Sequence, residues 1–327
     1  MSVGWGIAGC GWVARDHALP ALLATPGTHL VALHDVSEQA MDRLPVEAAR
    51  HSDLDAFLAM PGLDAVYVAT PNALHRPLVQ TALRAGISVL CEKPLAADIA
   101  DAEAMVAAMV EADAGTLLGT AYDQRWHPAH LRLRELLDEL GTVTAVRVAY
   151  GCWLPPDWSP DRRPYDNWRV DRARAGGGAA IDLAPHGLDL VGVLLGEDVK
   201  QLHAVTQHRV QTYEVDDGAL LHGRTAGGVL VDLHVSYNTP DALPRRRLEV
   251  LGTRATAVAT DTMGQTAGGT LVLHRPEPVE VPFGSGSPFA AQFAAFSSAV
   301  AGDSIWPYDA QRDLRLHRLL VGALESS

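Results

Sequence analysis

Hydrophobic residues in the first third of the chain occur in short runs that alternate with segments of helical periodicity. Polar or glycine-containing turns separate the two, and Ser37 and Gly86 stand where a helix N-cap and a helix end are expected. This alternation is typical of βα units, which build a parallel sheet. We therefore predict an α/β fold whose first domain is a doubly wound parallel sheet, with strands near residues 3–8, 30–33, 65–69, 87–91 and 116–120.

The pattern changes near residue 121. Alternating apolar and polar residues at 228–237 and 247–251 predict antiparallel strands with one solvated face. A loop rich in Trp, Pro and Arg runs from 153 to 174. Helical segments are predicted at 131–140, at 288–301, at 309–320, and from the glycines 176–178 to about 195. We predict two domains, residues 1–121 and 122–327.

The composition is that of a folded protein, with 48% hydrophobic and 20% charged residues. The net charge of −13 argues against nucleic acid as a partner, because that would require clustered Lys and Arg. The three cysteines are isolated, so neither a metal site nor a disulfide framework is indicated. The start lacks a signal-peptide pattern, and no apolar run reaches the roughly 18–20 residues of a membrane span. We expect a cytoplasmic protein without a membrane partner.

A glycine-rich turn follows the first predicted strand and opens the first predicted helix. It reads Gly9-Cys10-Gly11-Trp12-Val13-Ala14, with Ala in the place of the third glycine of a dinucleotide-binding fingerprint. Such glycines let a pyrophosphate approach the backbone at a helix N-terminus. We predict that residues 9–13 bind a dinucleotide; the alternative is a tight turn without a ligand.

Asp35 ends the second predicted strand, at the spacing from the glycines that the fingerprint requires. A carboxylate there accepts hydrogen bonds from the adenosine ribose and repels a 2′-phosphate. No arginine follows it directly. We therefore predict NAD rather than NADP as the cofactor; the alternative is an Asp that only caps the next turn.

Two further turns follow predicted strands at the same sheet edge, outside which ligands of open α/β sheets bind. One contains Thr70, Pro71, Asn72 and His75, and the other Glu92 and Lys93 before Pro94. We predict that all six contact the cofactor and that the Lys93 ammonium transfers a proton. The alternatives are turn and capping residues for the first, and a surface lysine for the second.

The glycine run at 176–178 leads into Asp182 and His186, which lie four residues apart and therefore on one face of a helix. A carboxylate and an imidazole on one face can orient a substrate hydroxyl and take its proton. Pro185 is expected to distort this turn. The alternative is a structural Asp–His pair.

In this order and spacing the segments resemble the Gfo/Idh/MocA oxidoreductases, a family that includes glucose–fructose oxidoreductase and inositol 2-dehydrogenase. The resemblance covers essentially the whole chain. It rests on the turn at 9–14, Thr70-Pro71-Asn72 with His75, Glu92-Lys93-Pro94, and Trp168-Arg169 leading into residues 176–186.

The resemblance implies a Rossmann domain followed by an α/β domain with a large open, mainly antiparallel sheet. That second domain would bind the substrate and form a homodimer or homotetramer. The family's pattern assigns catalysis to Lys93, Asp182 and His186, with Asp182 fixing the substrate and the imidazole. Further substrate contacts would come from Asp123, Gln124, Arg125, Trp168, Arg169 and Tyr237.

The expected activity is hydride transfer between NAD and a secondary carbinol or ketone of a sugar, cyclitol or sugar derivative. The Trp- and Arg-rich loop at 153–174 departs from the family pattern and suits either a sugar ring or a packed surface. Two alternatives remain. One is a glycoside hydrolase that oxidises its sugar transiently with bound NAD, and the other is a non-catalytic NAD-binding protein.

Overall fold

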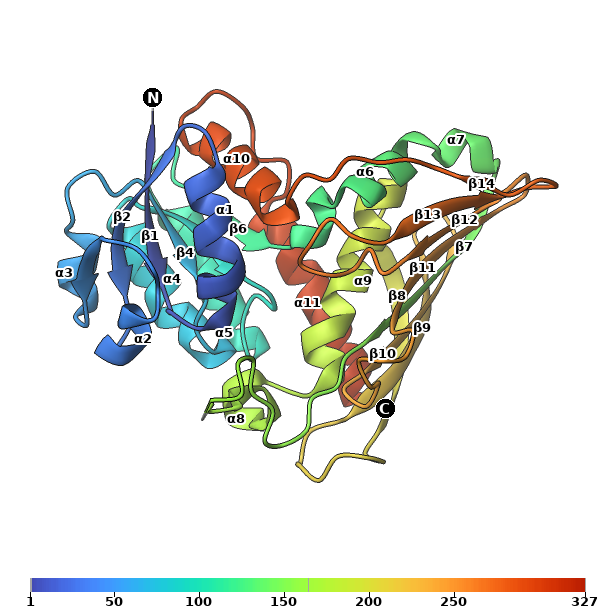
Figure 1. Ribbon diagram of the computed structural model, residues 1–327, viewed down its shortest axis with the longest axis horizontal. Coiled ribbons are helices and arrows are strands. Elements are labelled where there is room, and N and C mark those ends of the chain that lie inside the picture. Colours follow the sequence, from blue (N-terminus) through green and yellow to red (C-terminus); the bar gives the residue numbers. More distant parts are fainter. Residues whose placement is uncertain (1, 164, 327) are drawn as a thin grey trace. The chain divides into compact units, whose positions relative to one another are not determined.

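The computed structural model describes residues 2–163 and 165–326 and divides into two compact units (Figure 1). Unit 1 comprises Met1–Ala121 and Phe289–Arg315, and unit 2 comprises Tyr122–Pro288 and Leu316–Ser327. The predicted second domain extended to residue 327, whereas the structure packs residues 289–315 with the first unit.

Unit 1 contains a six-stranded sheet in the order β3-β2-β1-β4-β5-β6, and every pairing in it is parallel. The strands are β1 (Val3–Ala8), β2 (Thr28–His34), β3 (Ala49–His51), β4 (Ala65–Val68), β5 (Ser88–Glu92) and β6 (Leu118–Ala121). This is the Rossmann strand order, with a switch point between β1 and β4. All residues of β1 and β4 are buried, as expected for parallel strands covered on both faces. The predicted parallel, doubly wound sheet is therefore confirmed.

Helices lie on both faces of this sheet, with α1 on one face and α4 and α5 on the other (Figure 1). The helical segments of unit 1 are η1 (Ala14–Ala18), α1 (Leu19–Ala24), α2 (Glu38–Asp42), α3 (Leu54–Leu58), η2 (Asn72–Leu74), α4 (His75–Arg84), α5 (Ile99–Glu111) and α10 (Pro288–Val300). The predicted cap at Ser37 is present, because its side chain accepts a hydrogen bond from Ala40 N. Gly86 follows α4 with φ +74°, the left-handed conformation expected at a helix end.

α10 belongs to unit 1 because it packs on β1. The Trp5 and Phe293 rings pack edge to face, with their centroids 4.9 Å apart. Trp5 Nε1 also donates a hydrogen bond to Ser297 Oγ at 3.0 Å. Trp5 is completely buried. The domain boundary drawn from the sequence did not include α10 in the first unit, because the contacts between α10 and β1 join residues almost 300 positions apart.

Unit 2 contains an eight-stranded sheet in the order β14-β13-β12-β11-β7-β10-β9-β8. The strands are β7 (Val143–Gly151), β8 (Val199–Gln207), β9 (Gly218–Thr225), β10 (Leu230–Ser236), β11 (Arg246–Gly252), β12 (Thr256–Thr260), β13 (Thr270–His274) and β14 (Val279–Glu280). The sheet is mainly antiparallel, as predicted. β10 differs, since it pairs antiparallel with β9 but parallel with β7.

Helices cover one face of this sheet. The helical segments are η3 (Asp123–Trp126), α6 (Pro128–Glu135), α7 (Leu137–Leu140), η4 (Trp168–Val170), α8 (Arg172–Ala175), α9 (Ala179–Leu195) and α11 (Ala310–Glu325), the last of which begins in unit 1. The helix predicted over 131–140 is thus divided at Leu136, and α9 runs through Pro185 without interruption.

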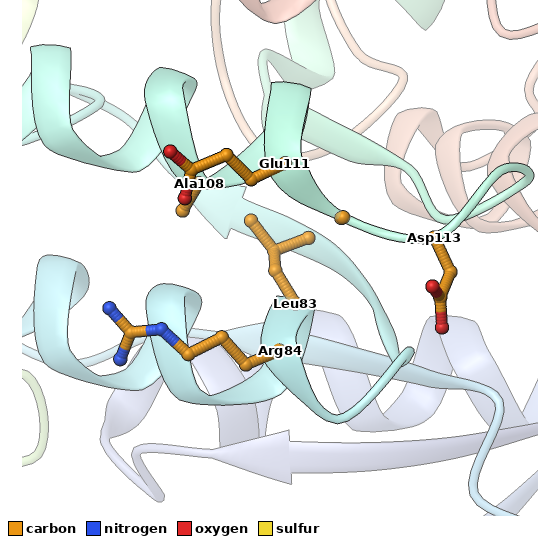
Figure 2. Close-up of a pocket in the computed structure, with 6 residues that line it drawn as sticks. Leu83, Arg84, Ala108, Glu111 and Asp113 are labelled. Atoms are coloured by element: carbon orange, nitrogen blue, oxygen red, sulfur yellow. The ribbon is translucent and has the colours of Figure 1, made fainter.

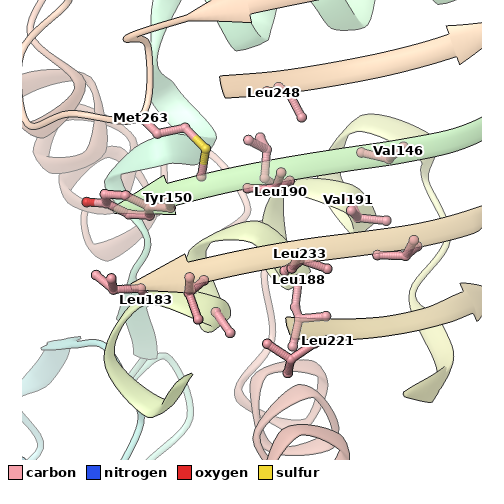
Figure 3. Close-up of a cluster of buried hydrophobic side chains, with 14 of the residues drawn as sticks. Val146, Tyr150, Leu183, Leu188, Leu190, Val191, Leu221, Leu233, Leu248 and Met263 are labelled. Carbon is pink, nitrogen blue, oxygen red and sulfur yellow. The ribbon is translucent and has the colours of Figure 1, made fainter. Parts of the chain in front are cut away.

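α9 forms the centre of the unit 2 core (Figure 3). Leu188 and Val191 from this helix pack among Tyr150, Leu233 and Leu248 of the strands. Gly187 permits the close approach, because a Cβ there would lie 2.6 Å from a Leu233 methyl group. The opposite face of the sheet is solvated: along β10, exposed and buried residues alternate.

The stretch Arg172–Leu195 is the one helix among the described residues that is long and apolar enough to span a membrane. Inside the protein, 83% of its most apolar window is buried. That burial is typical of the core helix of a soluble protein.

Candidate active site

The glycine-rich turn after β1 lies against the end of β4. Gly9 has φ +94°, and a Cβ there would lie 2.6 Å from the Ala69 carbonyl carbon and 2.7 Å from Thr70 N. Glycine is therefore required at this position. A Cβ at Gly11 would meet no atom within 4 Å, so the backbone there is open to a ligand.

The first turn of the helix that follows Gly11 begins with Trp12 and Val13 and continues as η1. Helix N-termini carry a partial positive charge and present backbone N–H groups, which favours an anion. Together with the open backbone at Gly11, this arrangement fits the pyrophosphate of a dinucleotide.

Asp35 follows β2 and connects this turn to the next one. Its carboxylate accepts hydrogen bonds from Cys10 N at 2.8 Å and from Ser37 N at 2.9 Å. Burial, and then the Asp35 charge, raise the pKa of the Cys10 thiol to about 12, so the thiol stays protonated and unreactive. The carboxylate thus stands at the edge of the nucleotide turn, as the sequence predicted, and also orders the turn itself.

His75 joins two turns at the carboxyl edge of the sheet. Its Nδ1 lies 3.2 Å from the Leu95 carbonyl oxygen, beyond β5, and its Nε2 lies 3.1 Å from the Thr70 carbonyl oxygen, beyond β4. Burial lowers the pKa of His75 to about 4, although the two carbonyls favour the charged form. The ring is therefore neutral at pH 7 and serves to hold the Thr70-Pro71-Asn72 turn rather than to carry charge.

The turn after β5 presents Lys93 at this same edge. The preceding Glu92 carboxylate accepts a hydrogen bond from the Tyr67 hydroxyl on the neighbouring strand β4, which fixes the end of β5. Thr70 Oγ1 is buried and has no hydrogen-bond partner among the described residues, as expected of a group that awaits a ligand. Unit 1 thus brings its predicted residues together at the ends of β1, β4 and β5.

A hollow of about 210 Å³ lies at the other edge of unit 1 (Figure 2). It is lined by the C-terminal ends of α4 and α5, including Leu83, Arg84, Glu111 and Asp113. Because helices of βα units run opposite to the strands, these ends face away from the ligand-binding edge. This hollow is therefore separate from the nucleotide turn.

In unit 2 the start of α9 is capped by a distant carboxylate. Asp216, in the segment before β9, accepts hydrogen bonds from Gly178 N at 2.9 Å and Ala180 N at 2.8 Å. A Cβ at Gly178 would lie 2.1 Å from the Asp216 carbonyl oxygen. The glycine at 178 thus allows two backbone segments to approach closely. The capping role of Asp216 was not predictable from the sequence, because Asp216 lies 38 residues from Gly178.

Asp182 lies one turn into α9 and is held by two side chains. Tyr237 Oη donates to Asp182 Oδ2 at 2.8 Å, and Arg169 Nε lies 4.0 Å from the same oxygen. Burial, and then the Asp182 charge, raise the pKa of Tyr237 well above its usual value, so its hydroxyl remains a donor.

Arg169 is fixed in turn by its neighbours. Its guanidinium lies 4.4 Å from the Trp168 ring centroid, and Nη1 donates to Tyr165 Oη at 3.2 Å. The structure therefore brings together the predicted residues Trp168, Arg169, Asp182 and Tyr237. Tyr165, in the loop at 153–174, was not predicted.

His186 lies one turn further along α9 and faces a different carboxylate. Its Nδ1 is 3.8 Å from Asp123 Oδ1, and the Tyr150 and Tyr122 rings lie 5.5 and 6.3 Å from the imidazole. The family pattern assigned the fixing of the imidazole to Asp182. In the structure, the carboxylate that meets His186 Nδ1 is that of Asp123.

Arg125 is used within the protein. Its Nε donates to Asp189 Oδ2 at 2.9 Å and its Nη2 donates to Asp189 Oδ1 at 2.8 Å, and both side chains are fully buried. This bidentate pair joins η3 to α9. The resemblance assigned Arg125 to the substrate, and in the structure two of its three guanidinium nitrogens bind Asp189.

Two family models match the chain. The oxidoreductase family model with an NAD-binding Rossmann fold matches residues 3–119, and the GFO/IDH/MocA C-terminal domain model matches residues 130–258. Over 304 residues the chain is 32% identical to 1,5-anhydro-D-fructose reductase of Ensifer adhaerens, an alignment that covers 91% of this chain and 88% of the relative.

Solved structures agree in fold. The aldose-aldose oxidoreductase from Caulobacter crescentus superposes with a TM-score of 0.86 at 24% identity, covering 100% of this chain and 98% of that one. A 3-ketoreductase from Actinomadura kijaniata, solved with NADP and TDP-benzene, has a TM-score of 0.83 at 26% identity, with 99% and 98% coverage. The chain carrying the glycine turn of unit 1 and the Asp182–His186 helix of unit 2 thus belongs to the GFO/IDH/MocA family of NAD(P)-binding oxidoreductases.

Proposed function

We propose that this protein is an NAD-dependent oxidoreductase that interconverts a secondary carbinol and a ketone on a sugar, a cyclitol or a sugar derivative. The observation that carries the proposal is the arrangement on α9, where Asp182 stands beside Tyr237 and Arg169. This group of an acceptor, a donor and a guanidinium suits a ligand with several hydroxyls. The name of the Ensifer relative, a reductase of 1,5-anhydro-D-fructose, supports a sugar-like substrate.

The cofactor would be held by residues 9–13 at the pyrophosphate, by Asp35 at the adenosine ribose, and by the turns at 70–72 and 92–93 nearer the nicotinamide. When bound, the nicotinamide supplies the position that accepts or donates a hydride. Thr70 Oγ1 offers a donor and acceptor to it, and His75 keeps the Thr70 turn in place.

The remaining chemistry is proton transfer and substrate orientation. The substrate hydroxyl loses its proton to His186 or Lys93 as the hydride leaves, and regains it in the reverse direction. Asp182, which accepts the Tyr237 hydrogen bond through Oδ2, also accepts a hydrogen bond from a substrate hydroxyl, because a carboxylate can accept several. Trp168 contributes an apolar aromatic surface for a sugar ring, and Arg169, which stacks on Trp168, contributes hydrogen-bond donors.

NAD is proposed over NADP because of Asp35. A 2′-phosphate would be repelled by this carboxylate, which two backbone N–H bonds hold at the end of β2. The Actinomadura ketoreductase was solved with NADP, so the preference for NAD is proposed from Asp35 and not from that relative.

The experiment that tests the function follows NADH absorbance in both directions with purified protein. The panel contains inositols, aldoses, 1,5-anhydro sugars, glycosides and nucleotide sugars, with NAD and with NADP. Turnover on a panel member with one NADH formed for each substrate oxidised supports the proposal. Release of an aglycone without net NADH contradicts it and favours the glycosidase chemistry instead.

We also propose a cytoplasmic homodimer or homotetramer formed through the open face of the unit 2 sheet. Val205 and Leu220 are 63% and 45% exposed on adjacent strands and lie directly opposite each other in the β8–β9 pairing. Adjacent exposed apolar side chains on a sheet face suit an interaction surface, where a contiguous apolar patch is buried on association. Light scattering during size-exclusion chromatography checks the assembly, and Leu220→Glu is expected to lower the measured mass; a monomeric wild type contradicts it.

A further inference from the structure

The carboxylate of Asp123 is aimed at the imidazole of His186. Asp123 Oδ1 lies 3.8 Å from His186 Nδ1, and each side chain is only 7% exposed. Asp123 opens η3, whereas His186 lies in α9, so the pairing is made by tertiary structure.

Gln124 determines which oxygen of Asp123 faces the ring. Its Nε2 donates to Asp123 Oδ2 at 3.0 Å and to the Gly264 carbonyl oxygen at 3.1 Å. Both partners are acceptors, so the amide nitrogen, with its two hydrogens, must face them. Oδ2 is thereby occupied, and Oδ1 is left toward His186.

A buried ion pair holds η3 against α9 at this point. Arg125 lies two residues after Asp123, and Asp189 lies three residues after His186. Their bidentate pair, at 2.8 and 2.9 Å with both side chains fully buried, restricts sliding of one element along the other. The spacing between Asp123 and His186 is therefore set by rigid elements and not by a flexible loop.

The other carboxylate on α9 is engaged elsewhere. Asp182 accepts a hydrogen bond from Tyr237, and the Arg169 guanidinium lies 4.0 Å from the same oxygen. The Tyr150 and Tyr122 rings also lie near the His186 ring, with centroids 5.5 and 6.3 Å from it. Asp123 is thus an anionic neighbour of this imidazole, with Oδ1 3.8 Å from Nδ1.

We propose that Asp123 is the positioning residue for His186 in the hydride-transfer reaction, an inference that rests on the proposed function. In this proposal Asp123 favours the hydrogen on Nδ1, so that Nε2 is the nitrogen that takes the substrate hydroxyl proton. In the oxidation direction the O–H bond breaks, the proton moves to Nε2, and the hydride leaves to NAD. The imidazolium that forms is stabilised by the Asp123 carboxylate. At 3.8 Å, Asp123 Oδ1 and His186 Nδ1 are not within hydrogen-bond distance in this structure, and the proposal requires them to come within it in the substrate complex.

The kinetic test uses Asp123→Asn, which keeps the size of the side chain and an acceptor for Gln124. We expect kcat to fall by about 10- to 10³-fold with little change in KM. The acidic limb of the pH profile of oxidation moves to lower pH, because the neutral amide no longer favours the protonated imidazole. Asp123→Glu restores part of the rate. The matched control is Asp138→Asn, an exposed carboxylate on α7 of the same unit.

A second measurement does not depend on turnover. With ¹⁵N-labelled histidine, NMR reports the tautomer of His186, whose signals are assigned by their loss in His186→Gln. We expect the Nδ1–H form in the wild type and a loss of that preference in Asp123→Asn. Equal rates and equal tautomers in wild type and Asp123→Asn overturn the proposal. If the wild type transfers no hydride on any substrate while the tautomer changes as expected, the proposed function fails and the Asp123–His186 pairing stands.

Discussion

The Tyr237 hydroxyl donates a 2.8 Å hydrogen bond to the carboxylate of Asp182, joining the residue after β10 to the first part of α9. Tyr237 is completely buried, and its raised pKa keeps the hydroxyl protonated. Asp182 Oδ2 thereby accepts a hydrogen bond from a hydroxyl that stays protonated. Under the proposed function, Asp182 and His186 on α9 have different roles: Asp182 receives substrate hydroxyls, and His186 exchanges the proton.

Replacing Tyr237 with Phe removes one donor from Asp182 without changing the core volume. We expect kcat/KM for the sugar substrate to fall about 10- to 100-fold, the loss typical of a hydrogen bond to a charged group. Steady-state kinetics check this. Tyr213→Phe is the matched control, since it removes a 3.1 Å bond to the Leu154 carbonyl that does not involve Asp182. Equal losses in the two variants would argue against a specific role.

Lys93 and His186 are expected to carry the proton. Lys93→Ala and His186→Ala should each lower kcat by about 10²–10⁴-fold, as for loss of a positioned acid or base. The chain has one other lysine, Lys200, exposed on β8, and Lys200→Ala should retain full activity. Near-normal turnover in both site variants would refute the assignment.

Cofactor preference should depend on Asp35. In Asp35→Asn the amide oxygen still accepts from Cys10 N but the negative charge is absent. We expect the ratio of kcat/KM for NAD to that for NADP to fall by about tenfold, equivalent to about 1.4 kcal/mol. The exposed Asp55→Asn on α3 should leave the ratio unchanged. A wild type that prefers NADP would contradict the proposal itself.

Acid should destabilise the fold partly through His75. Its pKa is lowered to about 4 in the folded protein by burial, so the unfolded chain takes up a proton first as the pH falls below 6.5. The resulting stability is fully present above pH 6.5 and is lost toward pH 4. Urea unfolding at pH 7.5 and pH 5.0 measures the loss.

His75→Gln removes this contribution. Between pH 7.5 and pH 5.0 the variant should lose about 2 kcal/mol less of its free energy of unfolding than the wild type does. The exposed His274→Gln on β13 should behave like the wild type. An identical pH dependence for wild type and His75→Gln would contradict the buried, neutral state of this ring.

The start of α9 should tolerate no side chain at Gly178. In Gly178→Ala the new Cβ would lie 2.1 Å from the Asp216 carbonyl oxygen, so the segment before β9 must shift and the Asp216 cap weakens. We expect a loss of about 1–3 kcal/mol in the free energy of unfolding, measured with urea. Gly322→Ala, in α11 with no atom within 4 Å of the new Cβ, should be neutral or stabilising by up to about 1 kcal/mol.

Local pattern predicted much of unit 1. The Gly9 turn, the Ser37 cap and the helix end at Gly86 each depend on residues only a few positions apart. The same is true of the spacing of Asp182 and His186 on one helix face. Such features are determined by backbone hydrogen bonding within one segment. The spacing of apolar residues and of capping residues in the sequence therefore predicts them.

The partners across the fold were decided by tertiary structure alone. Asp123 meets His186, Asp216 caps Gly178, Arg125 pairs with Asp189, and α10 returns to Trp5. The parallel pairing of β10 with β7 belongs to the same group. By itself the sequence determined the order of helices and strands, the glycine-rich turn after β1, and which residue types are present for catalysis. Which carboxylate serves which group depends on how distant segments pack, because burial and side-chain contact are properties of the whole core and not of any local window.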